Sequence, residues 1–437
     1  MKYAYIATGA ANMYCGSCMR DNTLVAAMKS LGHDVTMLPM YTPLRVDEEN
    51  ASENYVFYGG IEAYLLQQYP KQSLWRNMAV KVAKSQALLR MLPRFDIGSN
   101  VDPAKNAEMT LSMLRGEMGN QSPLLQEMVD WMSASLEPDL VHVTNTLISG
   151  VVPAIKRQLN VPIVCGLHGE DIFIDGLPAP YREQALDLIR ENCQNIDHFI
   201  AISQYYADYF APLIDIPSEK ITLVRPGIAL NEYGLNLREP SRDMPLTIGY
   251  LARISPEKGL HILADAFVRL CQSGQFPNLR LKASGYLSKV HHNYVRDIQA
   301  RLDDAGVSDR VEIIGTVDRQ QKLDFLSSID LFALPTIYRD PKGLPVLEAL
   351  ANGVPVVQPN HGAFPELIQA TGGGLLHEPG DSSDLSEKLA SLISNPTWRQ
   401  ELGERGRTAV YNQFSAQRMA TETIQAYQSV YLHENAL

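Results

Sequence analysis

The sequence contains few cysteines and has no surplus of positive charge. Five cysteines are spread thinly over 437 residues, which fits a reducing compartment better than a disulfide framework. Lysine and arginine number 38 against 49 aspartates and glutamates, so the net charge is −11. This balance argues against a general nucleic-acid binder, whose affinity depends on released counterions and therefore on a surplus of cations.

Long apolar runs are also lacking. The apolar stretch at the start reaches only to about Ala11, which is shorter than a signal peptide requires, and no run approaches the roughly 18 residues of a membrane-spanning helix. With 29 glycines and 26 prolines, the chain is far from low complexity. We therefore expect a folded cytoplasmic protein, whose length predicts two or three domains.

Strand-like and helix-like patterns alternate through the first half. An apolar run over 2–7 is followed by Leu24, Ala27 and Leu31 at helical spacing, and then by a second strand-like run. This alternation is typical of a parallel α/β domain, which we assign to residues 1–235. Its further strands are predicted over 34–38, 139–145, 161–167, 198–203 and 221–224.

A polar, proline-punctuated stretch ends near Pro245, and a new alternation begins there. We predict a second Rossmann-like domain over 246–412. The fold class is then α/β with two doubly wound domains that face each other across a cleft, and ligands are expected at the carboxyl ends of the strands. The strands of this domain are predicted over 246–252, 279–285, 310–315, 330–335 and 354–358.

Two segments lie outside this alternation. The last helix, within 413–437, carries an apolar face that includes Ala420, Ile424 and Tyr427, so we expect it to pack back on the first domain. A helical insertion is predicted near 65–130, and within it residues 71–94 hold six basic side chains and no acid. This basic segment favours either a solvated helical insertion or peripheral contact with the inner face of an anionic membrane.

The stretch 335–366 carries the strongest local signal. A strand ends at Pro335, a loop contains Asp340, and a helix begins at Gly343. The N-terminus of such a helix is suited to bind an anion. Glu348 lies about 7.5 Å further along that helix, where a carboxylate suits ribose hydroxyls better than a phosphate. The structural alternatives are a turn residue before Pro341 for Asp340 and a solvated helix face for Glu348.

A second signal lies in the sequence YLARISPEKGL. Arg253 and Lys258 bracket a short loop at a helix start, and a planar guanidinium beside a movable ammonium suits a diphosphate. Two solvated surface charges are the alternative interpretation.

Three loops of the first domain carry further candidates. His168 follows a strand, where a capping or packing role is the alternative to chemistry. Glu170 and Asp171 are predicted to orient an acceptor hydroxyl, with solvated acids or a helix cap as the alternative. Asn145 is an acceptor candidate or a loop cap. Gly16 permits a close approach of backbone to phosphate.

The spacing of Cys15 and Cys18 around Gly16 also permits a redox pair or half a zinc site. No second CxxC accompanies it, so we predict no metal site. An ordinary loop and a phosphate-binding turn remain the other two interpretations.

The span from Asp340 to Glu348 resembles the donor signature of retaining glycosyltransferases of the GT-B fold, family 4, whose pattern is two glutamates separated by seven residues. The resemblance implies that the first carboxylate lies near the reacting sugar. It also implies that backbone amides from Gly343 through Leu344 to Pro345 hold phosphate and sugar hydroxyls, and that Glu348 binds ribose.

The same resemblance assigns the remaining donor residues. It implies that Arg253 and Lys258 neutralise the leaving diphosphate, and that His168 approaches the donor sugar or the reaction centre. Main-chain groups near Val317 would hold the base, and the turn at Gly16 would touch donor phosphate or acceptor.

Two positions depart from the family pattern. Asp340 is shorter than glutamate by one carbon–carbon bond, about 1.5 Å, which alters its reach toward the sugar. Lys342 stands where the family usually has an aromatic or apolar residue, so we predict that it recognises an anionic group on donor or acceptor.

The expected function is therefore transfer of a hexosyl group from a nucleotide diphosphate sugar, of UDP or GDP type, with retention at the anomeric carbon. The acceptor is a carbohydrate, lipid or small molecule, and neither metal nor other cofactor is expected. The alternatives are a sugar phosphorylase or epimerase of the same fold, a non-catalytic nucleotide-sugar sensor, and a CxxC redox protein.

Overall fold

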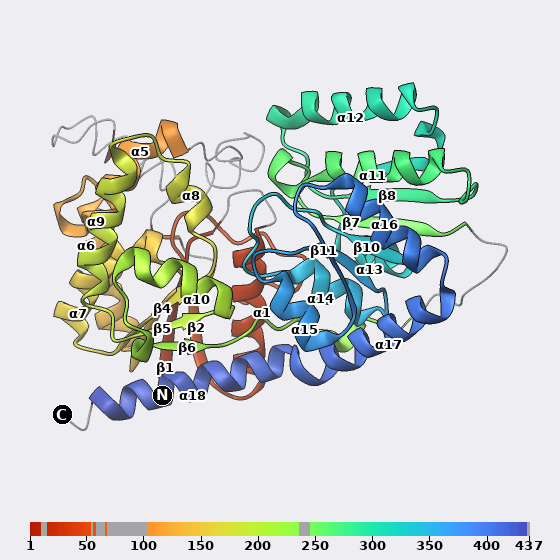
Figure 1. Ribbon diagram of the computed structural model, residues 1–437. Coiled ribbons are helices and arrows are strands. Elements are labelled where there is room, and N and C mark those ends of the chain that lie inside the picture. Colours follow the sequence, from red (N-terminus) through yellow and green to blue (C-terminus); the bar gives the residue numbers. More distant parts are fainter. Residues whose placement is uncertain (10–14, 54–55, 58–65, 68–102, 236–244, 435–437) are drawn as a thin grey trace. The chain divides into compact units, whose positions relative to one another are not determined.

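The computed structural model divides the chain into two compact units (Figure 1). The first unit comprises Met1–Gly227 and Gln417–Leu437, and the second unit comprises Ile228–Ala416. The basic segment 71–94, part of the loop before Gly16 and the polar stretch 236–244 lie outside the described residues. The structure describes residues 1–9, 15–53, 56–57, 66–67, 103–235 and 245–434.

The first unit contains a six-stranded sheet in which every strand pair is parallel. The strand order is β2-β1-β3-β4-β5-β6, and the predicted strands of this half are confirmed. Most of their residues are buried, as expected for a parallel sheet covered on both faces. The strands are β1 (Lys2–Ala7), β2 (Asp34–Pro39), β3 (Leu140–Val143), β4 (Ile163–Leu167), β5 (His198–Ala201) and β6 (Ile221–Leu223).

Helices follow the strands of the first unit, as the alternating pattern predicts. Two of them, α5 and α6, fall in the region 65–130 where a helical insertion is expected, and they contribute Leu111, Leu125 and Met128 to the core. The helices are α1 (Gly16–Ser30), α5 (Pro103–Leu114), α6 (Ser122–Trp131), α7 (Val152–Leu159), α8 (Asp171–Asp175), α9 (Tyr181–Cys193) and α10 (Gln204–Phe210).

The second unit also contains a parallel six-stranded sheet, in the order β12-β11-β10-β7-β8-β9. Strand β12 is missing from the sequence prediction, because its sequence GLLH holds only two consecutive apolar residues and follows two further glycines. The strands are β7 (Thr247–Leu251), β8 (Arg280–Ser284), β9 (Val311–Gly315), β10 (Leu331–Ala333), β11 (Val356–Pro359) and β12 (Gly374–His377).

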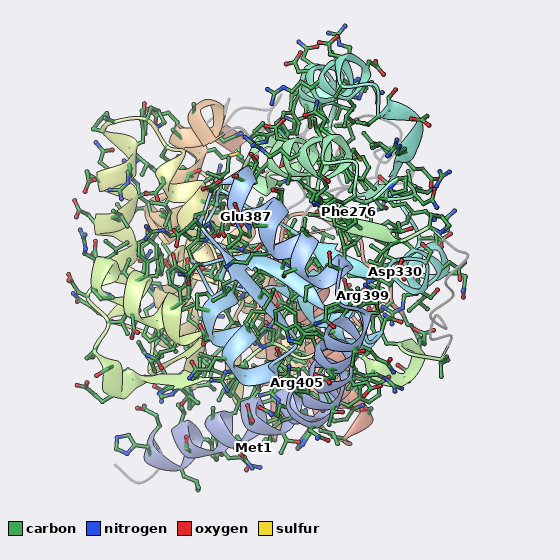
Figure 2. All side chains as sticks on the ribbon, turned by 45° about the vertical axis from the view of Figure 1, so that its right-hand side comes forward. Met1, Phe276, Asp330, Glu387, Arg399 and Arg405 are labelled. Atoms are coloured by element: carbon green, nitrogen blue, oxygen red, sulfur yellow. The ribbon has the colours of Figure 1, made fainter. Side chains whose placement is uncertain are left out.

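Helices alternate with these strands. Asp330, labelled in Figure 2, joins the start of β10 to β7, because its carboxylate accepts from Thr247 N at 2.8 Å and its own N–H donates to Thr247 O at 2.8 Å.

Among the described residues, no helix has the length and apolar character needed to cross a bilayer. The helices are α11 (Leu260–Gln272), α12 (His292–Asp304), α13 (Arg319–Ser327), α14 (Leu344–Ala351), α15 (Phe364–Thr371), α16 (Ser382–Ile393) and α17 (Pro396–Gln413).

Residues 228–235 belong to the second unit, although the sequence analysis assigns them to the first domain. The reason is a short backbone pairing. Ile228 N donates to Phe414 O at 2.9 Å, and Ala416 N donates to Ile228 O at 2.9 Å. This pairing holds the segment against the end of α17.

Each sheet has a switch point in its strand order. In the second unit the chain proceeds from β7 outward to β9 and then returns to β10 on the other side of β7. In the first unit the corresponding position lies between β1 and β3. Loops leave such a point in opposite directions, and open α/β sheets bind ligands there.

The C-terminal helix α18 (Ala416–Glu434) packs within the first unit through the face predicted from sequence. Ala420, Ile424 and Tyr427 are buried. The Tyr427 hydroxyl is 2.8 Å from Nδ1 of His142 on β3, and the Tyr427 ring lies 5.2 Å from that of Tyr3 on β1. Figure 1 shows this helix in blue beside the strands of the same unit.

We expect Tyr427→Phe to lower the free energy of unfolding by about 1 to 2 kcal/mol, because it leaves the buried His142 Nδ1 without its partner. Urea-induced unfolding measures the change. Leu432→Ser is the matched control, since Leu432 lies on the same helix and is 68% exposed. Equal stability of Tyr427→Phe and the wild type would contradict this role of the hydroxyl.

Candidate functional site

In the second unit, an ion pair joins the loops that leave β7 and β10 at the switch point. Lys258 follows β7 and Asp340 follows β10, and the Lys258 Nζ lies 2.7 Å from Asp340 Oδ2. Both side chains are largely buried, with 16% and 11% of their surface exposed. The structure therefore brings together two of the residues that the sequence analysis singled out.

The other oxygen of Asp340 organises its own loop. Oδ1 accepts hydrogen bonds from the N–H groups of Lys342 at 2.9 Å and Gly343 at 3.2 Å. Burial would raise the pKa of Asp340, but the charges of Lys258 and Lys342 and the hydrogen bonds to the carboxylate outweigh it and lower the pKa. Asp340 is therefore a carboxylate that acts both as a turn residue and as the partner of Lys258.

The two loops also touch through their backbones. Gly259 has φ +74°, and a Cβ at this position would lie 1.8 Å from Pro335 O. Ile337 N donates to Glu257 O at 2.9 Å. Only glycine permits so close an approach, so the geometry of this site depends on Gly259.

The N-terminus of α14 offers fewer donors than the sequence analysis expects. The Gly343 N–H is used by Asp340, and Pro345 has no N–H to give. The next two amides, of Val346 and Leu347, donate to Gly343 O. Among the described residues, the Leu344 amide is thus the one N–H in this first turn that no hydrogen bond occupies.

Arg253 lies at the same sheet edge but has a different partner. Its Nη2 is 2.5 Å from Oε1 of Glu257, four residues later, and its side chain is 40% exposed. Glu257 was not predicted as a counterion, although an acid four residues after Arg253 in the same short loop indicates such a pair.

Glu348 is buried on α14, so the alternative of a solvated helix face is wrong. It is 6% exposed, and its Oε1 accepts from Lys322 Nζ at 2.6 Å and from the Tyr233 hydroxyl at 2.9 Å. Neither partner was identified from sequence. The sequence does contain an indication that Lys322 is buried, because it shares a helical face with the apolar Phe325.

Val317 was predicted to bind the donor, and Lys342 to recognise an anionic group on donor or acceptor. Val317 lies in the loop after β9, where it packs against the core. The Lys342 side chain is partly exposed and, within the described parts of the chain, forms no ion pair, whereas its backbone N–H is held by Asp340.

In the first unit, His168 lies directly after β4 and is 1% exposed. Both ring nitrogens have hydroxyl neighbours: Nε2 is 3.3 Å from Thr144 Oγ1, and Nδ1 is 3.3 Å from Ser17 Oγ. These hydroxyls come from the loop after β3 and the first turn of α1, the two elements that flank this sheet's switch point.

A buried charged group lies behind His168. The Thr144 hydroxyl donates a short hydrogen bond to Oδ2 of Asp21 on α1, and Asp21 Oδ1 accepts from Tyr5 at 2.7 Å and from Arg20 at 3.1 Å. Neither Asp21 nor Thr144 was predicted as a site residue. Their contact joins positions 123 residues apart, which no local pattern reveals.

Glu170 forms hydrogen bonds with the loops after β3 and β4. Its Oε1 accepts from Thr146 Oγ1 at 3.1 Å, and its Oε2 accepts from His168 N at 2.9 Å and from Tyr206 OH at 3.2 Å. Burial raises the pKa of Glu170, and hydrogen bonds from the neighbouring backbone partly oppose this rise. The interpretation as a solvated acid is wrong for this residue.

The other two acceptor candidates of the first unit are Asn145 and Asp171. The Asn145 Oδ1 accepts from Leu147 N at 3.1 Å, which is the loop-capping arrangement. Asp171 opens the short helix α8, is 7% exposed, and its N–H donates to the Tyr206 hydroxyl at 3.2 Å.

Gly16 is the first residue of α1, and Cys15 before it provides no side-chain cap. None of the five cysteines, which all lie among the described residues, forms a disulfide; Cys15 is partly exposed and Cys18 is buried. Within the described ranges, no three histidine, cysteine or acidic side chains gather as metal ligands would.

Sequence comparison finds two family profiles along the chain. The profile of the family "Glycosyl transferases group 1" matches residues 237–409. The profile "Glycosyltransferase Family 4" matches residues 112–232. The first match contains the Lys258 and Asp340 loops, and the second contains His168.

Two curated relatives cover most of the chain. A glycogen synthase of Mycobacterium tuberculosis is 28% identical over 299 residues, which are 67% of this chain and 69% of the relative. A putative colanic acid biosynthesis glycosyltransferase of Escherichia coli, WcaL, is 26% identical over 325 residues, which are 72% and 76% of the two chains.

Solved structures share the fold. The Anabaena protein HepE in complex with UDP superimposes with a TM-score of 0.68 at 17% identity, covering 98% of this chain and 100% of HepE. A sucrose-phosphate synthase from Thermosynechococcus elongatus gives a TM-score of 0.71 at 19% identity, covering 99% and 100% of the two chains.

We expect the coupling free energy between Lys258 and Asp340 to be about 2 kcal/mol and to be equal at pH 8 and pH 5. The pKa of Asp340 is lowered on folding, so its stabilisation is complete above the unfolded value of about 3.9 and is lost only as the pH falls below it. A double-mutant cycle with Lys258→Met and Asp340→Asn, followed by urea-induced unfolding, measures the coupling.

The control is a cycle on the exposed pair Arg301 and Asp265, whose side chains are 54% and 40% exposed. Exposed pairs are worth less than about 1 kcal/mol. A Lys258–Asp340 coupling that disappears between pH 8 and pH 5 would show that the Asp340 pKa is not lowered.

Proposed function

The chain belongs to the glycosyl transferases group 1 family, glycosyltransferase family 4 with the GT-B fold, and we propose that it moves a hexosyl group from a nucleoside diphosphate sugar to an acceptor hydroxyl with retention at the anomeric carbon. Family membership rests on the two profiles, which together cover most of the chain. The glycosyltransferase class follows from that membership, whereas donor, acceptor and stereochemistry are our proposal.

The observation that carries the proposal is the Lys258–Asp340 pair at the switch point of the second sheet. An ammonium has three N–H donors, so a bond to Asp340 leaves others for a phosphate. The Leu344 amide opens α14 beside this pair, and Arg253 adds an exposed guanidinium after the same strand β7. These groups supply positive charge where a diphosphate is expected to bind.

The reaction separates charge at the donor. The bond between the anomeric carbon and the diphosphate oxygen breaks, and the acceptor oxygen forms a new bond to that carbon on the same face. The acceptor proton passes to the leaving phosphate. Arg253 and Lys258 would stabilise the departing diphosphate without reorganising, because the fold already holds them in place.

The other residues receive narrower roles. We propose that Glu348 accepts ribose hydroxyls and that the main chain near Val317 holds the base. We also propose that His168, which belongs to the first unit, approaches the donor sugar. Asp171 and the Lys342 side chain remain acceptor-side candidates.

We reassign Asn145 and Glu170 to positioning the loops, because their oxygens already accept hydrogen bonds from those loops. Gly16, at the start of α1, remains the candidate for a close backbone approach to phosphate.

A uridine donor is the first one to test. HepE has been crystallised with UDP, with UDP and glucose, and with UDP-glucose, and its fold is that of this chain. A thermal-shift screen of UDP and GDP sugars ranks the donors without knowledge of the acceptor, because a ligand of the folded state raises the unfolding temperature.

We expect Arg253→Ala and Lys258→Ala each to lower turnover by about 10²- to 10³-fold, as loss of one preorganised electrostatic donor does. The readout is release of nucleoside diphosphate, with and without acceptor. Arg280→Ala is the matched control, since Arg280 is exposed at the amino end of β8, at the opposite edge of the sheet. Unchanged turnover in both site variants would remove the proposed role.

The same assay separates the alternative activities. A transferase releases nucleoside diphosphate only with an acceptor, whereas an epimerase or a sensor releases none and a phosphorylase requires phosphate. Nuclear magnetic resonance of the product reports whether the anomeric configuration is retained.

We expect turnover to be unchanged by EDTA, because the proposed compensation of diphosphate charge comes from Arg253, Lys258 and the Leu344 amide. Turnover is measured on protein dialysed against EDTA, with Mg²⁺ or Mn²⁺ then added back. A loss of activity that either ion restores would show that a metal takes part.

A further inference from the structure

Glu348 is a charged side chain on a helix that is otherwise apolar. Its neighbours on α14 include Val346, Leu347 and Leu350, all of them buried, and Glu348 itself is 6% exposed. A carboxylate in such surroundings is costly unless it is paired and hydrogen-bonded. The contacts that compensate it therefore decide how it can be used.

Two donors from distant parts of the chain meet on one oxygen of this carboxylate. Lys322 on α13 approaches Oε1 at 2.6 Å, and the Tyr233 hydroxyl approaches the same oxygen at 2.9 Å. Both donors are themselves buried, at 5% and 2% exposure. Oε2 receives no hydrogen bond from the described residues.

Arg319 sets the direction of the hydrogen bond from the Tyr233 hydroxyl to Glu348. Arg319 Nη1 donates to the Tyr233 hydroxyl at 2.9 Å, and the guanidinium lies 4.7 Å from the centre of the Tyr233 ring. With an arginine donating to its oxygen, the hydroxyl points its own hydrogen toward Glu348. Burial and the charge of Glu348 also raise the pKa of Tyr233, so the phenol stays a donor.

The helix that carries Lys322 is anchored at its first turn. Asp318 accepts from Gln321 N at 2.9 Å, and Gln321 Oε1 accepts from Asp318 N at 3.0 Å, which forms a capping box. Lys322 follows immediately. Its ammonium therefore reaches Glu348 from a fixed helix start.

We propose that Lys322 and Tyr233 are positioning residues, which hold Oε1 of Glu348 so that Oε2 accepts a ribose hydroxyl and selects ribonucleotides over deoxyribonucleotides. The inference rests on the proposed function, because it assumes a nucleotide donor. Lys322 also neutralises the charge of Glu348. The carboxylate can therefore accept a hydrogen bond from the ribose without adding net negative charge near a diphosphate.

The test compares two probes, UDP and 2′,3′-dideoxy-UDP, which lacks both ribose hydroxyls. We expect the wild type to bind UDP about 10- to 100-fold more tightly by calorimetry, as loss of a hydrogen bond to a charged group predicts. In Lys322→Met this ratio should fall below about threefold. Lys322→Arg should restore part of it, because it keeps the charge.

Two further variants make the result specific. Tyr233→Phe keeps the ion pair and should lower the ratio by about threefold, and it decides the question if Lys322→Met does not fold. Lys282→Met is the matched control, because Lys282 in the same unit is 28% exposed and pairs with Glu312 at 3.9 Å. Its ratio should equal that of the wild type.

The failures of the two proposals are distinguishable. If the wild type binds UDP without discriminating it from the dideoxy form, the positioning role and the ribose role of Glu348 are both overturned, whereas the proposed transfer reaction stands. If Lys322→Met and Tyr233→Phe discriminate as well as the wild type, the positioning role alone is overturned. If the wild type binds none of UDP, GDP and ADP, the proposed function falls and this inference falls with it.

Discussion

The ion pair between Lys258 and Asp340 holds together two loops that leave the second sheet in opposite directions. One oxygen of Asp340 binds the lysine, and the other binds the two amides that start the turn into α14. The start of α14 and the approach of Gly259 to Pro335 both belong to this arrangement. A single carboxylate thus links the ends of β7 and β10.

Both acids of the donor signature are buried, and each is paired with a lysine from another element. Asp340 takes Lys258, and Glu348 takes Lys322. Buried ion pairs add little net stability compared with apolar packing, so their retention here is better explained by geometry than by energy. Each pair fixes the direction of one carboxylate and cancels its charge, so neither acid remains an uncompensated negative charge inside the second unit.

Much of the fold and part of the site could be predicted from the sequence. Strands such as 2–7 and 246–252 were found because alternation of strand and helix patterns is a local property. Asp340 and Glu348 were found because their spacing lies within one loop and one helix. Loss of the Pro345 amide was readable as well, since proline has no N–H.

The remainder of the site depends on contacts that no local pattern contains. The Tyr233 hydroxyl reaches Glu348 across 115 residues, and Thr144 reaches Asp21 across 123. Their partners are set by the strand order, which places segments distant in the chain at one edge of a sheet. Lys322 could be predicted in part. A lysine on an apolar helical face indicates that it has a buried partner, but the sequence does not show which residue that partner is.

The packing of α18 has a consequence for how the chain matures. The first unit is discontinuous, because residues 417–437 complete it after the whole of 228–416 has been made. Tyr427 can reach His142 only after the whole of the second unit has been synthesised. The second unit is continuous and can condense during synthesis, whereas the first must wait for its last helix. The second unit can therefore be completed before the first, although the first unit begins the chain.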